Sequence, residues 1–184
     1  MIVGKKVRLR ALEKSDLAKL WKWLNDEEVM WFWAEPCSVQ SLAEVEQWFA
    51  KLQETAGRFS KQFIIENEEG APIGRIHYEY LDTRHQRTEV GMQIGEKEYW
   101  GRGYGTDVVI AFLDYLFNEL GLHRVYLRLQ SYNTRALKCY EKCGFTQEGI
   151  LRHNTFTRGE YHDDLVMGIL RDEFNQRHKG NVTL

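Results

Sequence analysis

The sequence predicts an α/β protein in which helices cover both faces of one mixed, mostly antiparallel, twisted sheet. Three observations lead to this fold class. Strand-like segments cluster in the first half of the chain, separated by short polar turns. A strand, a helix and two more strands close the second half. Between the halves, a glycine-rich run at residues 101–106 opens a helix.

The chain begins with a predicted strand and two helices. Residues 7–12 alternate apolar and polar side chains, as expected for a half-buried strand. Ser15 is the predicted cap of the first helix. The second helix starts at a capping box formed by Ser41 and Glu44. Each helix has an apolar face, made of Leu17, Leu20, Trp21 and Leu24 in the first and Val45, Trp48, Phe49 and Leu52 in the second.

Three strands and the second half of the fold follow. Residues 59–66, 72–81 and 87–95 predict an antiparallel meander, with a turn at residues 67–70. The remaining elements are a helix ending at residues 120–121, a strand at 125–129, a helix from Asn133 to Gly144, strands around 145–151 and 162–170, and a short helix with a frayed end at 171–184. With 184 residues and 43% hydrophobic composition, the chain is expected to form a single domain over residues 1–184.

The glycine-rich run has the features of a site for a diphosphate. Glycines at alternate positions let backbone N–H groups approach an anion, and the following helix directs its positive end toward the same point. Thr106 and Asp107 follow Gly105, so the run lacks the Lys-Ser/Thr pair of a nucleotide triphosphate loop. The spacing also fails the dinucleotide fingerprint. The alternative is a flexible turn before a helix.

The helix at residues 133–144 completes the pattern. Asn133 is its predicted N-cap, Gly144 its C-terminal residue in the left-handed region, and Ala136 and Tyr140 share one face. Together with the glycine run and the strands between them, this segment resembles the GNAT superfamily of acyl-CoA-dependent N-acetyltransferases. The resemblance covers nearly the whole chain, and it is closest to the branch of ribosomal-protein and spermidine N-acetyltransferases. It implies a GNAT-like fold.

The resemblance also implies acetyl-CoA as the acetyl donor and a set of residues that hold it. The glycine run corresponds to the family's pyrophosphate cradle. The strand before the run corresponds to the strand that pairs with the pantetheine arm, and Asn133 to a residue that contacts the cofactor. The implied cofactor-binding residues are Met92, Gln93, Ile94, Gly101, Arg102, Gly103, Tyr104, Gly105, Thr106, Asn133, Arg135 and Tyr140.

The implied catalytic residues are Tyr140 and Glu89. Tyr140 corresponds to the general acid that protonates the departing thiolate, although a role limited to packing against the cofactor is the alternative. An amine of pKa ~10.4 must lose a proton before it attacks a thioester, so a general base is needed. Glu89 is the favoured base, acting directly or through water, and Glu79 is the alternative. A backbone N–H near Gln93 or Ile94 is expected to stabilise the oxyanion.

The acceptor is expected to be a primary amine of a polyamine such as spermidine or spermine, or of another small molecule. Aromatic rings and carboxylates suit an aliphatic polycation, and residues 29–36 resemble the matching region of bacterial spermidine N-acetyltransferases. The alternative is a hydrophobic corner between helices. Acetylation of protein N-termini, as in ribosomal-protein acetyltransferases, or of aminoglycosides and amino sugars remains open, as does a non-catalytic acyl-CoA-binding regulator. The expected substrate-binding residues are Glu28, Trp31, Trp33, Glu35 and Glu79.

Composition limits the other function classes. A formal net charge of −2 and a pI near 6.3 argue against a nucleic-acid or membrane partner. Three cysteines and no secretory apolar segment indicate a reduced, cytoplasmic protein. Neither the cysteines nor the six histidines have metal-ligand spacing, so no metal is expected. The resemblance adds the expectation of a homodimer.

Overall fold

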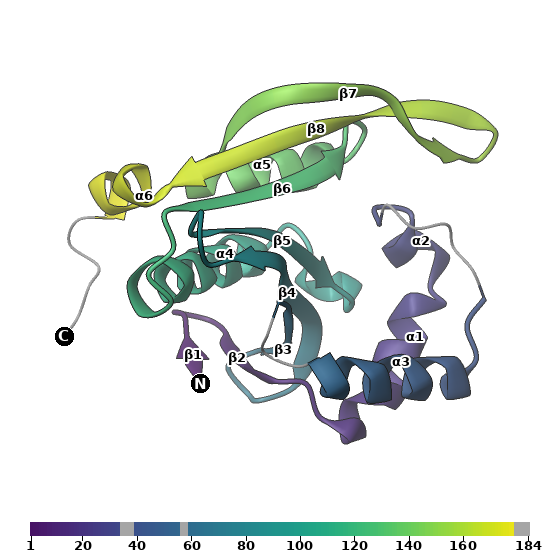
Figure 1. The fold of residues 1–184 in the computed structure, drawn as a ribbon. Helices are drawn as coiled ribbons and strands as arrows, with labels where there is room; N and C mark the ends of the chain where they lie inside the picture. Colours follow the sequence, from purple (N-terminus) through teal and green to yellow (C-terminus); the bar gives the residue numbers. More distant parts are fainter. Residues whose placement is uncertain (34–38, 56–58, 179–184) are drawn as a thin grey trace.

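The computed structural model describes residues 1–33, 39–55 and 59–178. Among them, eight strands form one sheet in the order β1-β2-β3-β4-β5-β6-β8-β7 (Figure 1). Within it the β5–β6 pair is parallel and the other pairs are antiparallel, which confirms the predicted mixed sheet. The strands are β1 (Ile2–Val3), β2 (Arg8–Ala11), β3 (Lys61–Glu66), β4 (Pro72–Asp82), β5 (Arg87–Ile94), β6 (Arg124–Gln130), β7 (Thr146–Thr157) and β8 (Glu160–Leu170).

Helices cover both faces of the sheet, and each face has its own apolar cluster. On one face, α4 and α5 pack over the larger cluster, which contains Phe63, Phe112 and Ile169. On the other face, α1, α2 and α3 enclose a smaller cluster around Leu20 and Ile64. The helices are α1 (Leu17–Leu24), α2 (Glu27–Met30), α3 (Leu42–Thr55), α4 (Tyr104–Asp114), α5 (Thr134–Cys143) and α6 (Arg171–His178). In the described ranges, no helix is long and apolar enough to span a membrane.

Two of the three predicted helix caps are confirmed. The Ser41 backbone N–H donates to Glu44 at 2.6 Å, and the Glu44 N–H donates to the Ser41 hydroxyl at 3.2 Å. Asn133 caps α5 by accepting from the Ala136 N–H at 3.1 Å, and Gly144 ends α5 with φ of 103°. These caps fix both ends of the helix that carries Tyr140.

The prediction for Ser15 is wrong. Ser15 lies inside a 3₁₀ turn, Lys14–Asp16, and the N-cap residue of this turn is Glu13. Asp16 accepts from the Glu13 N–H at 2.9 Å and also pairs with Arg10 at 2.7 Å. Asp16 stands at the N-cap position of α1, but its carboxylate makes no capping bond to that helix and instead completes the capping box of the 3₁₀ turn with Glu13.

Four other elements also differ from the prediction. The sequence reasoning missed β1 and α2, since two and four residues are too short for a periodic signal. β7 and β8 are longer than predicted and form an extended hairpin at one end of the sheet (Figure 1). The hairpin contains irregular pairing between residues 151 and 155, which interrupts the alternation that a strand prediction uses.

The sheet opens between β5 and β6. These parallel strands pair only at their beginnings, where Thr88 stands opposite Val125 and Glu89 opposite Tyr126. After Glu89, β5 stays paired with β4, and β6 stays paired with β8. The two strands therefore diverge and leave a cleft in the sheet, with the N-terminus of α5 on its β6 side.

Candidate active site

A groove of about 280 Å³ lies where the glycine run meets α5. Gly101 and Gly103 have φ of 70° and 86°, which side chains with a Cβ rarely adopt. The turn that they form brings backbone N–H groups to the start of α4. At Gly105, a Cβ atom would lie 3.2 Å from Cε of Met92, so the loop sits directly against β5. The groove thus has a backbone wall.

The opposite wall of the groove comes from α5. Arg135 lies with its guanidinium 3.7 Å from the ring centre of Trp100 and 4.8 Å from that of Phe32. Lys138 and Lys142 also line the groove. Cationic side chains facing a glycine turn at a helix N-terminus form a donor set that suits a diphosphate. The residues present therefore fit the phosphate part of acetyl-CoA.

Most of the predicted cofactor-binding residues line this groove. They are Met92, Gln93, Ile94, Gly101, Gly103, Gly105, Thr106, Asn133 and Arg135. Three do not. The Arg102 side chain is exposed and donates to the Glu98 carbonyl at 3.3 Å. Tyr104 is buried in the larger core, with its hydroxyl donating to Glu68 at 2.9 Å. Tyr140 lines the neighbouring cavity instead.

Several groove residues were absent from the predicted set. Trp100 donates from Nε1 to the Ile94 carbonyl at 2.8 Å and so joins the end of β5 to the loop. Lys138, Cys139 and Lys142 share one face of α5 with Arg135. Their spacing of three, four and seven residues from Arg135 was a usable signal, because such positions lie on the same side of a helix.

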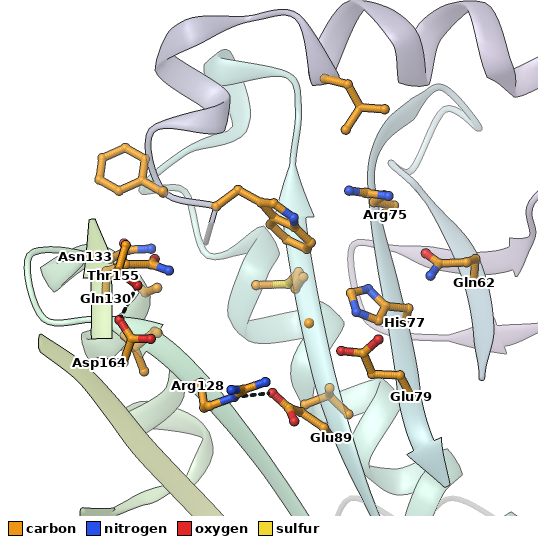
Figure 2. A pocket seen from close by; sticks show the side chains of 18 of the residues that line it. Gln62, Arg75, His77, Glu79, Glu89, Arg128, Gln130, Asn133, Thr155 and Asp164 are labelled. Carbon is orange, nitrogen blue, oxygen red and sulfur yellow. Dashed lines mark hydrogen bonds and ion pairs between the residues drawn. The ribbon is translucent and has the colours of Figure 1, made fainter. Parts of the chain in front are cut away.

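The neighbouring cavity is larger, about 760 Å³, and its floor is formed by β4 and β5 (Figure 2). Alternate residues of paired strands point to the same face, so the floor is a ladder of cross-strand pairs. Arg75 faces Gln93, His77 faces Gly91, and Glu79 faces Glu89. Arg75 donates from Nε to Gln93 at 3.1 Å. The ladder runs from a cationic end to an anionic end.

The anionic end brings together the two predicted general bases. Glu79 and Glu89 are directly opposite each other, an arrangement that repels unless a cation compensates it. Arg128, from β6, donates to Glu89 at 3.0 Å across the opening of the sheet. Glu89 is only 9% exposed. The side wall adds Asp164, whose carboxylate accepts from Thr155 and Asn154 at 2.7 Å each.

The middle of the ladder holds a buried imidazole. His77 is 8% exposed, and its ring lies 5.9 Å from that of Trp33. Burial, assisted by the charge of Arg75, lowers the pKa of His77 to about 3. The imidazole is therefore neutral at physiological pH. Sequence reasoning gave His77 no role, because a single histidine on a strand has no distinguishing pattern.

Tyr140 enters the same cavity from α5. Its side chain is 5% exposed and packs edge-on against Phe145, with ring centres 5.4 Å apart. Burial raises the pKa of the phenol far above its ordinary value, so the hydroxyl stays protonated. The cavity and the groove share Met92, Asn133 and Ala136 in their walls. Ala136 is one helical turn before Tyr140, so a protonated phenol lies close to the junction of the two spaces.

The predicted substrate-binding residues divide between two places. Trp33 and Glu79 line the large cavity. Glu28 and Trp31 line a separate hollow beside α2, so their placement in the acceptor site is not supported. Glu28 pairs with Lys97 at 2.9 Å, and Trp31 stacks on Tyr132 with ring centres 4.8 Å apart. Glu35 lies outside the described residues.

Comparison with known proteins identifies the family to which this chain is similar. Residues 6–146 match the family model described as an acetyltransferase (GNAT) domain. A spermidine N(1)-acetyltransferase of Vibrio cholerae is 31% identical over 176 residues, which cover 95% of this chain and 99% of the relative. The Escherichia coli K12 enzyme of that name is 30% identical over 173 residues, covering 94% and 90%. A crystal structure of the Vibrio cholerae spermidine N-acetyltransferase with CoA and spermine has a TM-score of 0.86 and 30% identity, covering 93% of this chain and 99% of that one.

Proposed function

Since the chain belongs to the GNAT acetyltransferase family, we propose that it transfers an acetyl group from acetyl-CoA directly to a primary amine of a polyamine such as spermidine or spermine. The observation that carries this proposal is the junction of two cavities. A groove with backbone donors and cations adjoins an acceptor cavity with two facing carboxylates, and the spaces share Met92, Asn133 and Ala136. The named substrates of the relatives support the same choice of acceptor.

Acetyl-CoA supplies an activated acetyl thioester when bound. We propose that residues 101–106 hold its diphosphate through backbone N–H groups, with Arg135, Lys138 and Lys142 adding positive charge. The strand from Met92 to Ile94 borders the groove and leads toward the acceptor cavity. A backbone N–H of Gln93 or Ile94 is the proposed donor to the carbonyl oxygen as negative charge develops there.

We propose that two side chains move the protons. Glu89, supported by Arg128, accepts a proton from the acceptor ammonium, directly or through water, and Glu79 opposite it holds the amine by charge. Tyr140 donates its hydroxyl proton to the departing sulfur. Its burial supports this role, since a phenol kept protonated is always ready to donate.

A side-by-side acetyl transfer assay tests the proposal. The purified protein would be given acetyl-CoA with spermidine, with peptides carrying free N-termini and with an aminoglycoside, and CoA release would be measured. Turnover of spermidine above the other amines is expected. If only a peptide or only an aminoglycoside were acetylated, that compound would take the place of the polyamine as the proposed acceptor. Binding of acetyl-CoA without any turnover would favour a non-catalytic regulator. A homodimer and a cytoplasmic location remain predictions.

A further inference from the structure

We propose that Gln62 and His77 form a subsite that holds an internal secondary ammonium of a linear polyamine, while another nitrogen of the same molecule is acetylated. This inference rests on the proposed function. The subsite is a second recognition point in the acceptor cavity, separate from the residues that act on the reacting amine. The nitrogen that it recognises is the internal secondary one.

The two side chains are neighbours on one face of the sheet. Gln62 on β3 stands opposite His77 on β4, and His77 stands opposite Gly91 on β5. Both side chains line the acceptor cavity, and Figure 2 shows the Gln62 amide pointing toward the His77 ring. A Cβ atom at residue 91 would lie 2.5 Å from Cε1 of His77. Any side chain at residue 91 would clash with the imidazole, so the glycine makes the space in which His77 lies.

Each side chain has a buried polar atom without a protein partner. Oε1 of Gln62 and Nδ1 of His77 make no hydrogen bond within the described part of the chain. A buried acceptor left without a donor costs free energy, and such atoms in native proteins usually meet a ligand or an ordered water. Two of them from adjacent strands, facing the same cavity, point to a ligand with N–H donors.

The chemistry of the pair matches a secondary ammonium. Such a group has two N–H donors. The subsite offers two acceptors, the Gln62 amide oxygen and Nδ1 of His77 in the tautomer that carries its proton on Nε2. The imidazole is neutral at physiological pH because it is buried beside Arg75. It therefore accepts a hydrogen bond and adds no positive charge of its own. The nearby guanidinium of Arg75 is directed to Gln93 and to the Trp33 ring, and Glu79 supplies negative charge on the other side of His77. The Trp33 ring beside it provides an apolar surface for the adjoining methylenes.

The position of the subsite also fits the length of a polyamine. Gly91, opposite His77, is two residues from Glu89 along β5, which corresponds to roughly 7 Å. Glu79 is the same distance from His77 along β4 and adds negative charge between the two points. An amine at Glu89 and a second nitrogen at His77 are thus separated by a few methylenes.

The test compares spermidine with 1,8-diaminooctane, in which a methylene replaces the internal nitrogen. The wild-type ratio of kcat/KM for spermidine to that for 1,8-diaminooctane is expected to be well above one. Gln62→Leu and His77→Leu should each lower this ratio about tenfold, as expected for one lost hydrogen bond to a charged group. His77→Gln, which keeps a neutral acceptor, should restore part of the ratio. Lys61→Leu is the matched control, because Lys61 is the exposed neighbour of Gln62 on β3 and lies over Phe63.

The outcomes separate this inference from the proposed function. Equal use of spermidine and 1,8-diaminooctane by the wild-type protein would overturn the subsite and leave acetyl transfer to amines intact. A wild-type preference that survives both leucine variants would also overturn it. Failure to acetylate either compound would remove the proposed function and the subsite together. Thermal unfolding of each variant checks that a change in ratio does not come from loss of folding.

Discussion

The donor groove and the acceptor cavity are built in opposite ways. The donor groove is built mainly from three compact segments, the end of β5 at residues 92–94, the loop at residues 101–106 and one face of α5. The acceptor cavity uses side chains from β3, β4, β5 and β6, from α3 and from the hairpin β7–β8. The diphosphate of acetyl-CoA is the same for every acceptor, and its proposed partners are backbone N–H groups of the loop together with the charges of Arg135, Lys138 and Lys142. The variable part, the amine, is met by side chains whose identity sets the choice.

This difference predicts how substitutions act. Changes in the groove should weaken acetyl-CoA binding whichever amine is used. Changes in the cavity should alter turnover or the amine and spare acetyl-CoA. Residues at the junction should affect the chemical step. Four experiments test this division, and the first should change the measured rate or affinity the most.

Tyr140→Phe should have the largest effect. Removing the hydroxyl takes away the proposed proton donor, so kcat should fall about 10²–10³-fold. The ring still packs against Phe145, so acetyl-CoA affinity by calorimetry should stay within about twofold. Unchanged kcat would leave Tyr140 with a packing role only. Because burial raises the phenol pKa, the wild-type rate should show no loss from Tyr140 ionisation up to pH 10.

Glu89→Gln should come next. The amide cannot accept the amine proton, so kcat at neutral pH should fall about 10²-fold. Glu79→Gln is the matched comparison, since the two carboxylates are cross-strand partners. That variant should mainly raise KM for the amine. If the Glu79 variant lost kcat and the Glu89 variant did not, the roles of the two residues would be exchanged.

Gly103→Ala tests the groove alone. A Cβ at this position meets no atom within 4 Å, so the cost is backbone strain at φ of 86°, about 1 kcal/mol. Acetyl-CoA affinity should fall about fivefold, with little change in KM for spermidine. Gly70→Ala is the control, because Gly70 has φ of 79° and equally open surroundings but lies in the turn between β3 and β4. Equal loss of acetyl-CoA affinity in both variants would contradict a specific role for the loop.

Cys139 offers a smaller, chemical readout of the same groove. The Cys143 thiol and, to a lesser degree, the Thr106 hydroxyl lower the pKa of Cys139, whereas the pKa of Cys143 is raised. Iodoacetamide should therefore label Cys139 at lower pH than a free thiol, with labelling rising as pH rises. Acetyl-CoA should slow the reaction several-fold, as measured by peptide mass spectrometry. Absence of protection would mean that this face of α5 lies outside the bound cofactor.

The donor side could be predicted from local features of the sequence. Glycines at 101 and 103, the cap at Asn133 and the end of α5 at Gly144 are local features, because each depends on the backbone geometry of a few consecutive residues. The resemblance to the GNAT superfamily rested on the same segments. It also led to Glu89 and Tyr140, whose catalytic roles are still predictions.

The acceptor side depends instead on contacts between residues that are far apart in the sequence. Strand register brought Gln62, His77 and Glu79 onto one face with Glu89, although they are distant in sequence. The fold also separates Glu28 and Trp31 from that face, since Glu28 in α2 and Trp31 just after α2 line another hollow. Contacts between distant residues depend on how strands pair and where the sheet opens, and neither leaves a local pattern in the sequence. The choice of amine therefore depends on pairings that composition and spacing do not contain.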